Sequence, residues 1–301
     1  SIPVPKEFRL GTADTFFGFG PMIAYDPLEL LDAGIYKLVP NPFGDVVVKS
    51  YSIDERLITP YIQANIRADL GSTELTGNLG VQAIFTEQRS VGASAVFQGT
   101  NPNGSPIVGA AVNDDTVDYV DVLPSLNLAF RMPSDFVIRF AAAREIVRSR
   151  LDDLRNSMNN QYLITTDANN NPIALVTGSS GNPELRPWRA NALDLTFEKY
   201  WGVKGYLAAQ FFWKKLKTYI FNQDVLVPTS ELALSPAMQG TDVVPFAEFA
   251  TINSPINGKG GKLYGVELAG TLPFETFIPA LEGFGVTGGV SYTKSKIRPT
   301  P

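Results

Sequence analysis

Apolar and polar residues alternate with a period of two through most of the chain beyond position 57. In the segment 57–70 every second residue from Ile62 to Leu70 is apolar, and the residues between them are Gln63, Asn65, Arg67 and Asp69. Successive side chains of a β-strand point to opposite faces, so this alternation indicates strands with one apolar and one polar face. Eight segments follow the pattern: 57–70, 75–98, 117–131, 135–148, 191–200, 206–221, 262–272 and 284–296.

The connections between these segments alternate in length. Those after positions 70, 131 and 201 are short and the one after 272 is moderately short, whereas 99–116, 148–190 and 222–261 are long and rich in Gly, Pro, Asn and Asp. Outer-membrane barrels have short periplasmic turns and long extracellular loops. The sequence therefore predicts an all-β fold: an antiparallel transmembrane β-barrel segment with short periplasmic turns and long extracellular loops.

Two regions break the alternation. Residues 1–56 are predicted to form an irregular extracellular loop region, with one short helix over 26–32, ahead of a partial outer-membrane barrel of about eight strands over 57–301. The segment 150–158, RLDDLRNSM, favours about two turns of helix within the second long loop. The segment 75–98 is long for one strand and could form one strand or two.

Composition narrows the function classes. The net charge of −5 and the scattered basic residues make nucleic acid an improbable partner, and cysteine and histidine are both absent. Disulfides, thiolate or histidine metal sites and Ser-His-Asp catalysis are thereby excluded, so an enzyme would depend on carboxylates or lysines alone. We expect neither an enzyme nor a cofactor. No run of about 18 apolar residues could form a transmembrane helix, and a membrane protein without one must be a β-barrel.

Five segments, in order along the chain, resemble the barrel region of TonB-dependent outer-membrane receptors, especially those of the proteobacterial branch. They are LPSLNLAFRMPSDFVIRFAAAREIVRSRLDDL (123–154), GNPELRPWRANALDLTFEKYW (181–201), YLAAQFFWKKLKTYIF (206–221), GKGGKLYGVELAGTLPF (258–274) and GFGVTGGVSYTKSKI (283–297). Together they extend over roughly the last two thirds of the chain.

The resemblance implies a 22-stranded barrel with a plug domain, of which this chain would be an internal piece with the plug absent. It also implies a place in the bacterial outer membrane, in contact with lipid, and energy from the TonB–ExbB–ExbD system through the missing plug. The implied function is active uptake of a scarce nutrient such as an oligosaccharide or a siderophore. Such a transporter performs no covalent chemistry.

Candidate ligand-binding residues fall into two groups. Polar and charged residues on the polar faces of strands are predicted to face the lumen, where they could bind ligand or hydrate and cross-link the wall: Asn65, Arg67, Asp69, Arg139, Asp194, Glu198 and Glu267. Aromatic residues of the loops could stack on a flat ligand or pack within the loops: Tyr162, Trp188, Phe246 and Phe249. Aromatic and amide side chains together suit oligosaccharides, which favours a carbohydrate over a siderophore.

Three alternatives stay open at this point. A complete eight-stranded barrel with a structural or adhesive role would pair its first strand with its last. A soluble β-sandwich glycosidase would need two carboxylates about 5–10 Å apart in a cleft. The acidic pairs Asp114–Asp115 and Asp152–Asp153 could bind Ca²⁺, but they lack the spacing of a calcium-binding loop and are better explained as solvated loop residues.

Overall fold

The structure is a computed structural model that describes residues 4–13, 20–38, 44–100, 102, 106–202 and 204–297. It consists of two compact units, Ser1–Pro42 and Phe43–Pro301. In the first unit η1 (Lys6–Phe8) precedes the antiparallel pair β1 (Arg9–Ala13) and β2 (Met22–Tyr25). The predicted helix over 26–32 is confirmed as α1 (Pro27–Asp32), which begins where the Asp26 carboxylate accepts a hydrogen bond from Leu28 N at 2.8 Å.

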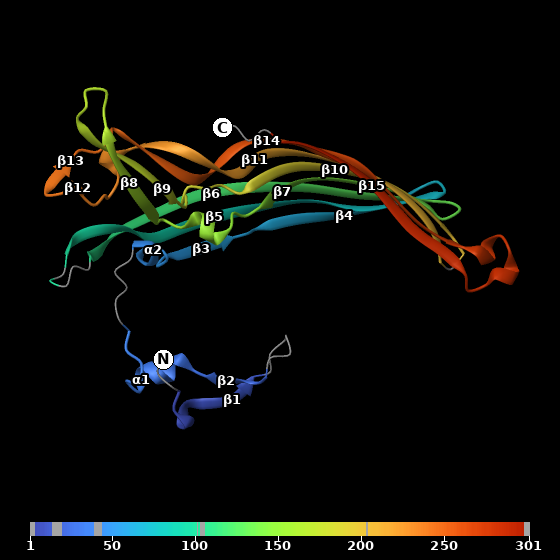
Figure 1. Cartoon of the computed structure of the whole chain (residues 1–301). Helices are drawn as coiled ribbons and strands as arrows, with labels where there is room; N and C mark the ends of the chain where they lie inside the picture. The colour runs from blue at the N-terminus through green and yellow to red at the C-terminus, as the bar shows by residue number, and fades with distance from the viewer. Residues whose placement is uncertain are drawn as a thin grey trace. The chain divides into compact units, whose positions relative to one another are not determined.

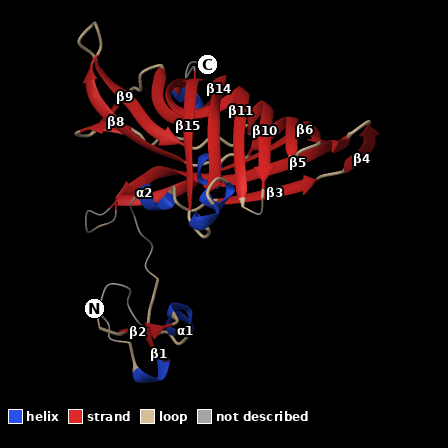
Figure 2. Ribbon diagram, turned by 90° about the vertical axis from the view of Figure 1, so that its right-hand side faces the viewer, coloured by secondary structure: helices blue, strands red, loops and turns tan. Residues whose placement is uncertain are grey.

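The second unit is built on one large sheet (Figures 1 and 2). After α2 (Gly44–Val47), its main strands are β3 (Ser52–Ile58), β4 (Tyr61–Leu70), β5 (Thr73–Thr100), β6 (Pro106–Met132), β7 (Phe136–Val147), β10 (Trp188–Trp201), β11 (Gly205–Pro228), β14 (Phe249–Pro273) and β15 (Gly285–Ile297). Each pairs antiparallel with the next, except that β3 and β4 lie one after the other along the same edge of β5. Seven of the eight predicted segments each lie in one strand of this sheet, and the segment 57–70 is divided between β3 and β4.

Tight turns join the strands at one end of the sheet, as predicted. Gly71 has φ +66° in the turn before β5, and Ser134 and Asp135 have φ of +65° and +57° in the turn before β7. The Asp135 carbonyl accepts a hydrogen bond from Tyr200 N at 3.0 Å, so this turn is joined to the neighbouring strand as well. The last connection holds two short 3-10 helices, η4 (Phe274–Thr276) and η5 (Pro279–Leu281).

The sheet is curved, but the strands described here do not close it into a barrel. β3 and β4 pair only with β5, and β15 pairs only with β14. A complete eight-stranded barrel would pair the first of these strands with the last, so the structure contradicts that alternative. A sandwich needs two sheets packed face to face, and the main strands form a single sheet instead.

At the opposite end, the expected loops contain more regular structure than the sequence indicated. Most of 99–116 is strand, because β5 and β6 extend far beyond the apolar part of the sheet, and the segment 75–98 is one strand. The loop expected over 222–261 is similarly shortened by β11 and β14. The helix expected over 150–158 was wrong: a single 3-10 turn, η2 (Leu151–Leu154), precedes strand β8.

The remaining loop segments pack into one small assembly, which we call the loop lobe. It contains the hairpins β8 (Met158–Thr166)–β9 (Pro172–Ser180) and β12 (Ala237–Gln239)–β13 (Asp242–Val244), with η3 (Thr229–Glu231) and the adjoining ends of β11 and β14. β9 pairs parallel with β14 at Thr251–Asn253. Met158, Val176, Ala250 and Ile252 form its buried core.

The two faces of the sheet differ in polarity throughout. On one face large apolar side chains are exposed on most strands, among them Ile62 (70%), Leu79 (52%) and Val290 (65%). Contiguous exposed apolar surface of this extent marks contact with lipid or another apolar partner. We call it the apolar face and the opposite one the polar face. No helix in the described ranges is both long and apolar enough to cross a membrane.

Candidate ligand-binding site

Strand register places all the predicted lumen-facing residues on the polar face. Arg67, Arg139 and Glu267 lie in one row that runs directly across the sheet, through the partners Thr76, Ala129, Thr196 and Gln210. Neighbouring strands are about 4.8 Å apart, so Arg139 is roughly 14 Å along the sheet from each of the other two. These three residues therefore share a face without forming one compact site.

Three of the predicted residues are engaged in cross-strand ion pairs. Arg139 donates to Glu198 at 2.8 Å, Tyr200 donates its hydroxyl to the same carboxylate at 2.9 Å, and Arg67 contacts Glu74 at 3.1 Å. Each pair joins two strands, which is the wall-stabilising role expected as the alternative to ligand contact. Among described residues, the carboxylates of Asp69, Asp194 and Glu267 make no ion pair or side-chain hydrogen bond, so they remain free to bind a ligand.

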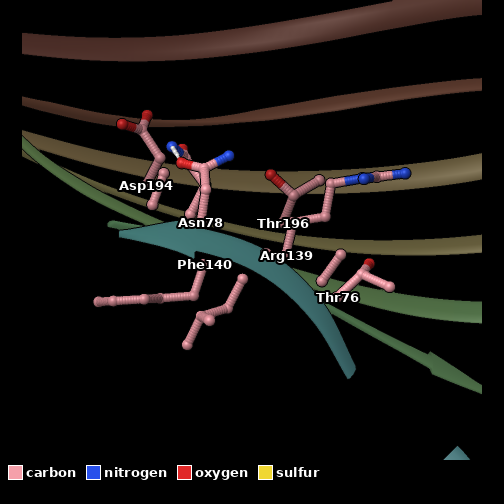
Figure 3. A pocket seen from close by; sticks show the side chains of 11 residues that line it. Thr76, Asn78, Arg139, Phe140, Asp194 and Thr196 are labelled. Atoms are coloured by element: carbon pink, nitrogen blue, oxygen red, sulfur yellow. Dashed lines mark hydrogen bonds between the residues drawn. The ribbon is translucent and has the colours of Figure 1, made fainter. Parts of the chain in front are cut away.

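A hollow of about 360 Å³ lies on the sheet around Asp194 (Figure 3). Its polar lining comes from four strands: Thr76, Asn78, Asn127, Arg139, Asp194 and Thr196. Asn127 donates to Asn78 at 2.9 Å. Figure 3 shows Asn78, Asp194 and Thr196 projecting to one side of the sheet and Phe140 to the other. The hollow thus combines one free carboxylate with amides, hydroxyls and a guanidinium.

Reasoning from the sequence missed Asn78, Asn127 and Thr196 as members of this site. Each lies on the polar face of a predicted strand, so alternation already assigned its direction. What alternation does not give is register, which brings Asn78 opposite Asn127 and places Asp194 two strands from Asn127 in the same row.

The sequence also did not indicate that parts of the loop 148–190 lie against the polar face of β5 and β6. Gln88 donates to Pro183 O at 2.7 Å, and Asn156 donates to Asp115 at 2.7 Å. Arg189 forms an ion pair with Asp121, whose side chain is only 4% exposed. These contacts anchor the loop, so this part of the chain covers strand surface instead of extending freely.

The four aromatic candidates do not form one stacking platform. Tyr162 and Phe246 meet edge to face with ring centroids 5.9 Å apart, and Tyr162 donates its hydroxyl to Pro236 O at 3.1 Å. Trp188 packs instead on Tyr219, at 4.7 Å between centroids. Phe249 is 47% exposed at the first residue of β14. Tyr162 and Phe246, which come from different long loops, thus serve chiefly to join them.

The acidic pairs are occupied by protein partners. Arg150 contacts Asp152 at 2.6 Å, and Arg89 contacts Asp114 at 2.6 Å. Burial, and next the charge of Asp152, raise the pKa of the Asp153 carboxyl above its ordinary value. Among the described residues, no group of three or more acidic, histidine or cysteine side chains could hold a metal ion.

These features together define a class of protein. A curved antiparallel sheet with an apolar and a polar face, tight turns at one end and long loops at the other is the wall of a transmembrane β-barrel. The family model described as "TonB dependent receptor-like, beta-barrel" matches residues 6–301, and the chain belongs to this family.

Solved structures similar to the chain are receptors, at low identity. The siderophore receptor PirA from Pseudomonas aeruginosa is 13% identical with a TM-score of 0.44, over 82% of this chain and 44% of that one. PirA from Acinetobacter baumannii is 16% identical with a TM-score of 0.42, over 79% and 37%. A double mutant of the Serratia marcescens hemophore receptor HasR, in complex with HasA and heme, is 13% identical with a TM-score of 0.29, over 73% and 42%.

The chain spans less than half the length of these receptors. No curated protein matches it.

Proposed function

We propose that the chain forms part of the wall of a bacterial outer-membrane receptor that takes up a scarce nutrient with energy from the TonB–ExbB–ExbD system. Family membership supports the receptor class. The observation that carries the proposal is the two-faced sheet, because an exposed apolar face suits lipid and a continuous polar face suits a water-filled or plugged lumen. The apolar face would contact outer-membrane lipid directly.

The ligand we favour is a carbohydrate. The hollow around Asp194 offers amide, hydroxyl and carboxylate groups, which pair with the many hydroxyls of a sugar. Asp194 would accept hydrogen bonds, and Asn78 and Asn127 would each both donate and accept. A siderophore is the competing ligand, and Arg139 would then provide positive charge for its acidic groups.

The proposed role is recognition and passage, not covalent chemistry. With neither histidine nor cysteine anywhere in the sequence, acid–base chemistry would depend on carboxylates and lysines alone. The loop lobe, held by its own apolar core, would present Phe249 and the surrounding polar residues at the mouth of the lumen. We propose residues 1–56 as an irregular extracellular loop region and 57–301 as wall and loops.

Isothermal titration of the detergent-folded chain with a panel of oligosaccharides and ferric siderophores tests this function. Replacing Asp194 by alanine removes a charged acceptor, and we expect affinity for the bound ligand to fall roughly tenfold or more. Glu282→Ala, which removes one carboxylate at the turn end, is the matched control and should bind normally. If Asp194→Ala bound the ligand as tightly as Glu282→Ala and the unchanged chain, the hollow would not be the ligand site. If the chain bound siderophores and no oligosaccharide, the preference for a carbohydrate would be wrong.

A further inference from the structure

A row of basic residues crosses the apolar face of the sheet at its loop end. Lys215 of β11 is paired directly with Lys262 of β14, which in turn is paired directly with Lys296 of β15. The row continues through Asn191 of β10 to Arg144 of β7. Directly paired residues of antiparallel strands point to the same face. We call Arg144, Lys215, Lys262 and Lys296 the basic row.

The basic row borders the apolar face instead of interrupting it. Two residues nearer the turn end lie Ala142, Leu193, Trp213, Tyr264 and Lys294. Below them the face is aliphatic and aromatic as far as Lys199 beside the turn. Lys217 adds a further cation two residues beyond Lys215 on the same face. The acidic residues of β7, β10, β11 and β14 fall on the polar face by register: Glu145, Asp194, Glu198, Asp224 and Glu267. The border is therefore positive without local compensation.

A hollow of about 360 Å³ opens beside the basic row. Four lysines line it, Lys215, Lys259, Lys262 and Lys296, together with the glycines at positions 260 and 261. A Cβ atom at Gly260 would lie 2.0 Å from Leu216 O, and one at Gly261 would lie 2.3 Å from Lys296 O. Glycine is required at both positions for the strands to approach, and it leaves the hollow open.

The arrangement lacks a counter-charge within the described part of the chain. None of the three lysines of the row takes part in an ion pair. Cβ atoms of directly opposite residues are about 4.5–5.5 Å apart, and like charges at that separation destabilise a strand pair. Two such contacts in succession, Lys215–Lys262 and Lys262–Lys296, therefore favour an anionic partner.

The distance of the basic row from the turn end of the sheet indicates what that partner is. From Leu207 at the turn end to Lys215 the strand advances about 27 Å at roughly 3.4 Å per residue. With a strand tilt of about 40° this spans about 20 Å of membrane, close to the apolar band of roughly 25 Å in outer-membrane barrels. The lysines would then stand where lipid headgroups meet acyl chains.

We propose that the basic row binds the phosphate groups of anionic lipid in the outward-facing leaflet. Phosphate charge compensates the lysines, and the acyl chains of the same lipid lie on Trp213, Tyr264 and the apolar face below. A free phosphate ion would gain only the first of these contacts, which is why we assign a lipid. The inference rests on the proposed function, since it requires the apolar face to lie in a membrane.

Tryptophan quenching by brominated lipids tests the inference. The 301-residue chain is reconstituted in vesicles of phosphatidylcholine that contain either brominated phosphatidic acid or brominated phosphatidylcholine, and the signal of Trp213 is obtained by difference from Trp213→Phe. We expect phosphatidic acid to be preferred at least about fivefold, because one lysine near an anionic surface already contributes about that factor. The variant K215Q/K262Q/K296Q should show a preference near one.

The matched control, K37Q/K49Q/K204Q, removes the same charge from exposed positions that are not part of the row and should keep the preference. Equal quenching of the wild-type protein by both lipids would overturn the proposal that the basic row binds anionic lipid, but it would still place the apolar face in the membrane. Absence of quenching by either lipid would instead overturn the proposed function. If inorganic phosphate at tens of millimolar abolished the preference, the site would be a general anion site and the lipid assignment would be wrong.

Discussion

The wall, formed by the main strands of the large sheet, and the loop lobe are stabilised in opposite ways. In the wall, large apolar side chains such as Leu79 and Val290 are exposed, and the polar face is joined by ion pairs such as Arg139–Glu198. In the lobe, apolar residues are buried together: Val176 is 2% exposed, Ala250 0% and Ile252 3%. The wall depends on its surroundings for apolar contact, whereas the lobe provides its own.

This difference indicates the environment that suits each region, which is water for the lobe and lipid for one face of the wall. A protein in water gathers apolar side chains into a buried core, and the lobe has such a core. The wall reverses it on one face only, which suits a sheet one layer thick between lipid and lumen. Substitutions should therefore have different costs according to region and face.

The largest effect is expected from truncation of the lobe core. Ile252→Ala leaves a cavity among Met158, Val176 and Ala250, and such truncations cost roughly 2–5 kcal/mol. Hydrogen exchange followed by mass spectrometry should then show amides of β8 and β9 exchanging about 100-fold faster, since 1.4 kcal/mol corresponds to about a factor of ten.

The matched truncation in the wall is Val290→Ala, at a side chain that is 65% exposed. We expect a loss under about 1 kcal/mol there, because no enclosed cavity forms. If Ile252→Ala and Val290→Ala accelerated amide exchange equally, the wall and the lobe would share one core, and the two regions would not differ in how they are stabilised.

A second pair of variants compares the two faces of one strand. Leu195 lies halfway between Asn191 and Lys199 on the apolar face of β10, and Thr196 is its neighbour on the polar face. Leu195→Arg should cost roughly 2–4 kcal/mol in vesicles, as expected for a charge near the bilayer midplane, and Thr196→Arg less than about 1. Urea unfolding of the vesicle-bound chain measures both. Similar losses at the two sites would show that both faces meet water.

The wall was predictable from the sequence because lipid imposes a strict rule on it. Each strand crossing lipid must alternate, so the residues of the apolar and polar faces and the tight turns were all visible in the pattern. The polar-face positions of Arg67, Asp194 and Glu267 followed for the same reason. Their distances did not, because register depends on contacts between strands that one strand's sequence does not encode.

The lobe and the far ends of β5 and β6 were not predictable in this way. Beyond the lipid, strands have no apolar face to maintain, so the Gly-, Pro- and Asn-rich segment 99–116 suggested a loop although backbone pairing continues through it. The segment 150–158 suggested a helix from its leucines, but Asn156 and Ser157 bond to neighbouring segments and a strand begins at Met158. Tertiary contacts determined these elements.

A double-mutant cycle on Arg139 and Glu198 measures how much the polar face contributes to the wall. Arg139 is 46% exposed and Glu198 12%, so solvent screens the pair in part and we expect a coupling of about 0.5–1 kcal/mol. The variants are Arg139→Met and Glu198→Gln, with unfolding followed in urea. The same cycle on Arg67 and Glu74, at 81% and 34% exposed, should give less. A larger coupling for the more exposed pair would contradict burial as the controlling factor.

The smallest effect concerns a turn of the lobe that lies in water. Asp167 accepts hydrogen bonds from Asn169 N at 2.8 Å and Asn171 N at 2.9 Å, and these backbone donors lower the pKa of its carboxyl below the ordinary value of 3.8. A lowered folded-state pKa stabilises the turn above pH 3.8, and the contribution is lost as pH falls through the folded value. Amide exchange at Asn169 and Asn171 should therefore gain protection above that pH in wild type but not in Asp167→Ala. In the described strands β10 and β11 no carboxylate falls on the apolar face. Amide exchange in these two strands should therefore keep the same protection in both proteins, and a matching loss there would show that wall and lobe titrate as one unit.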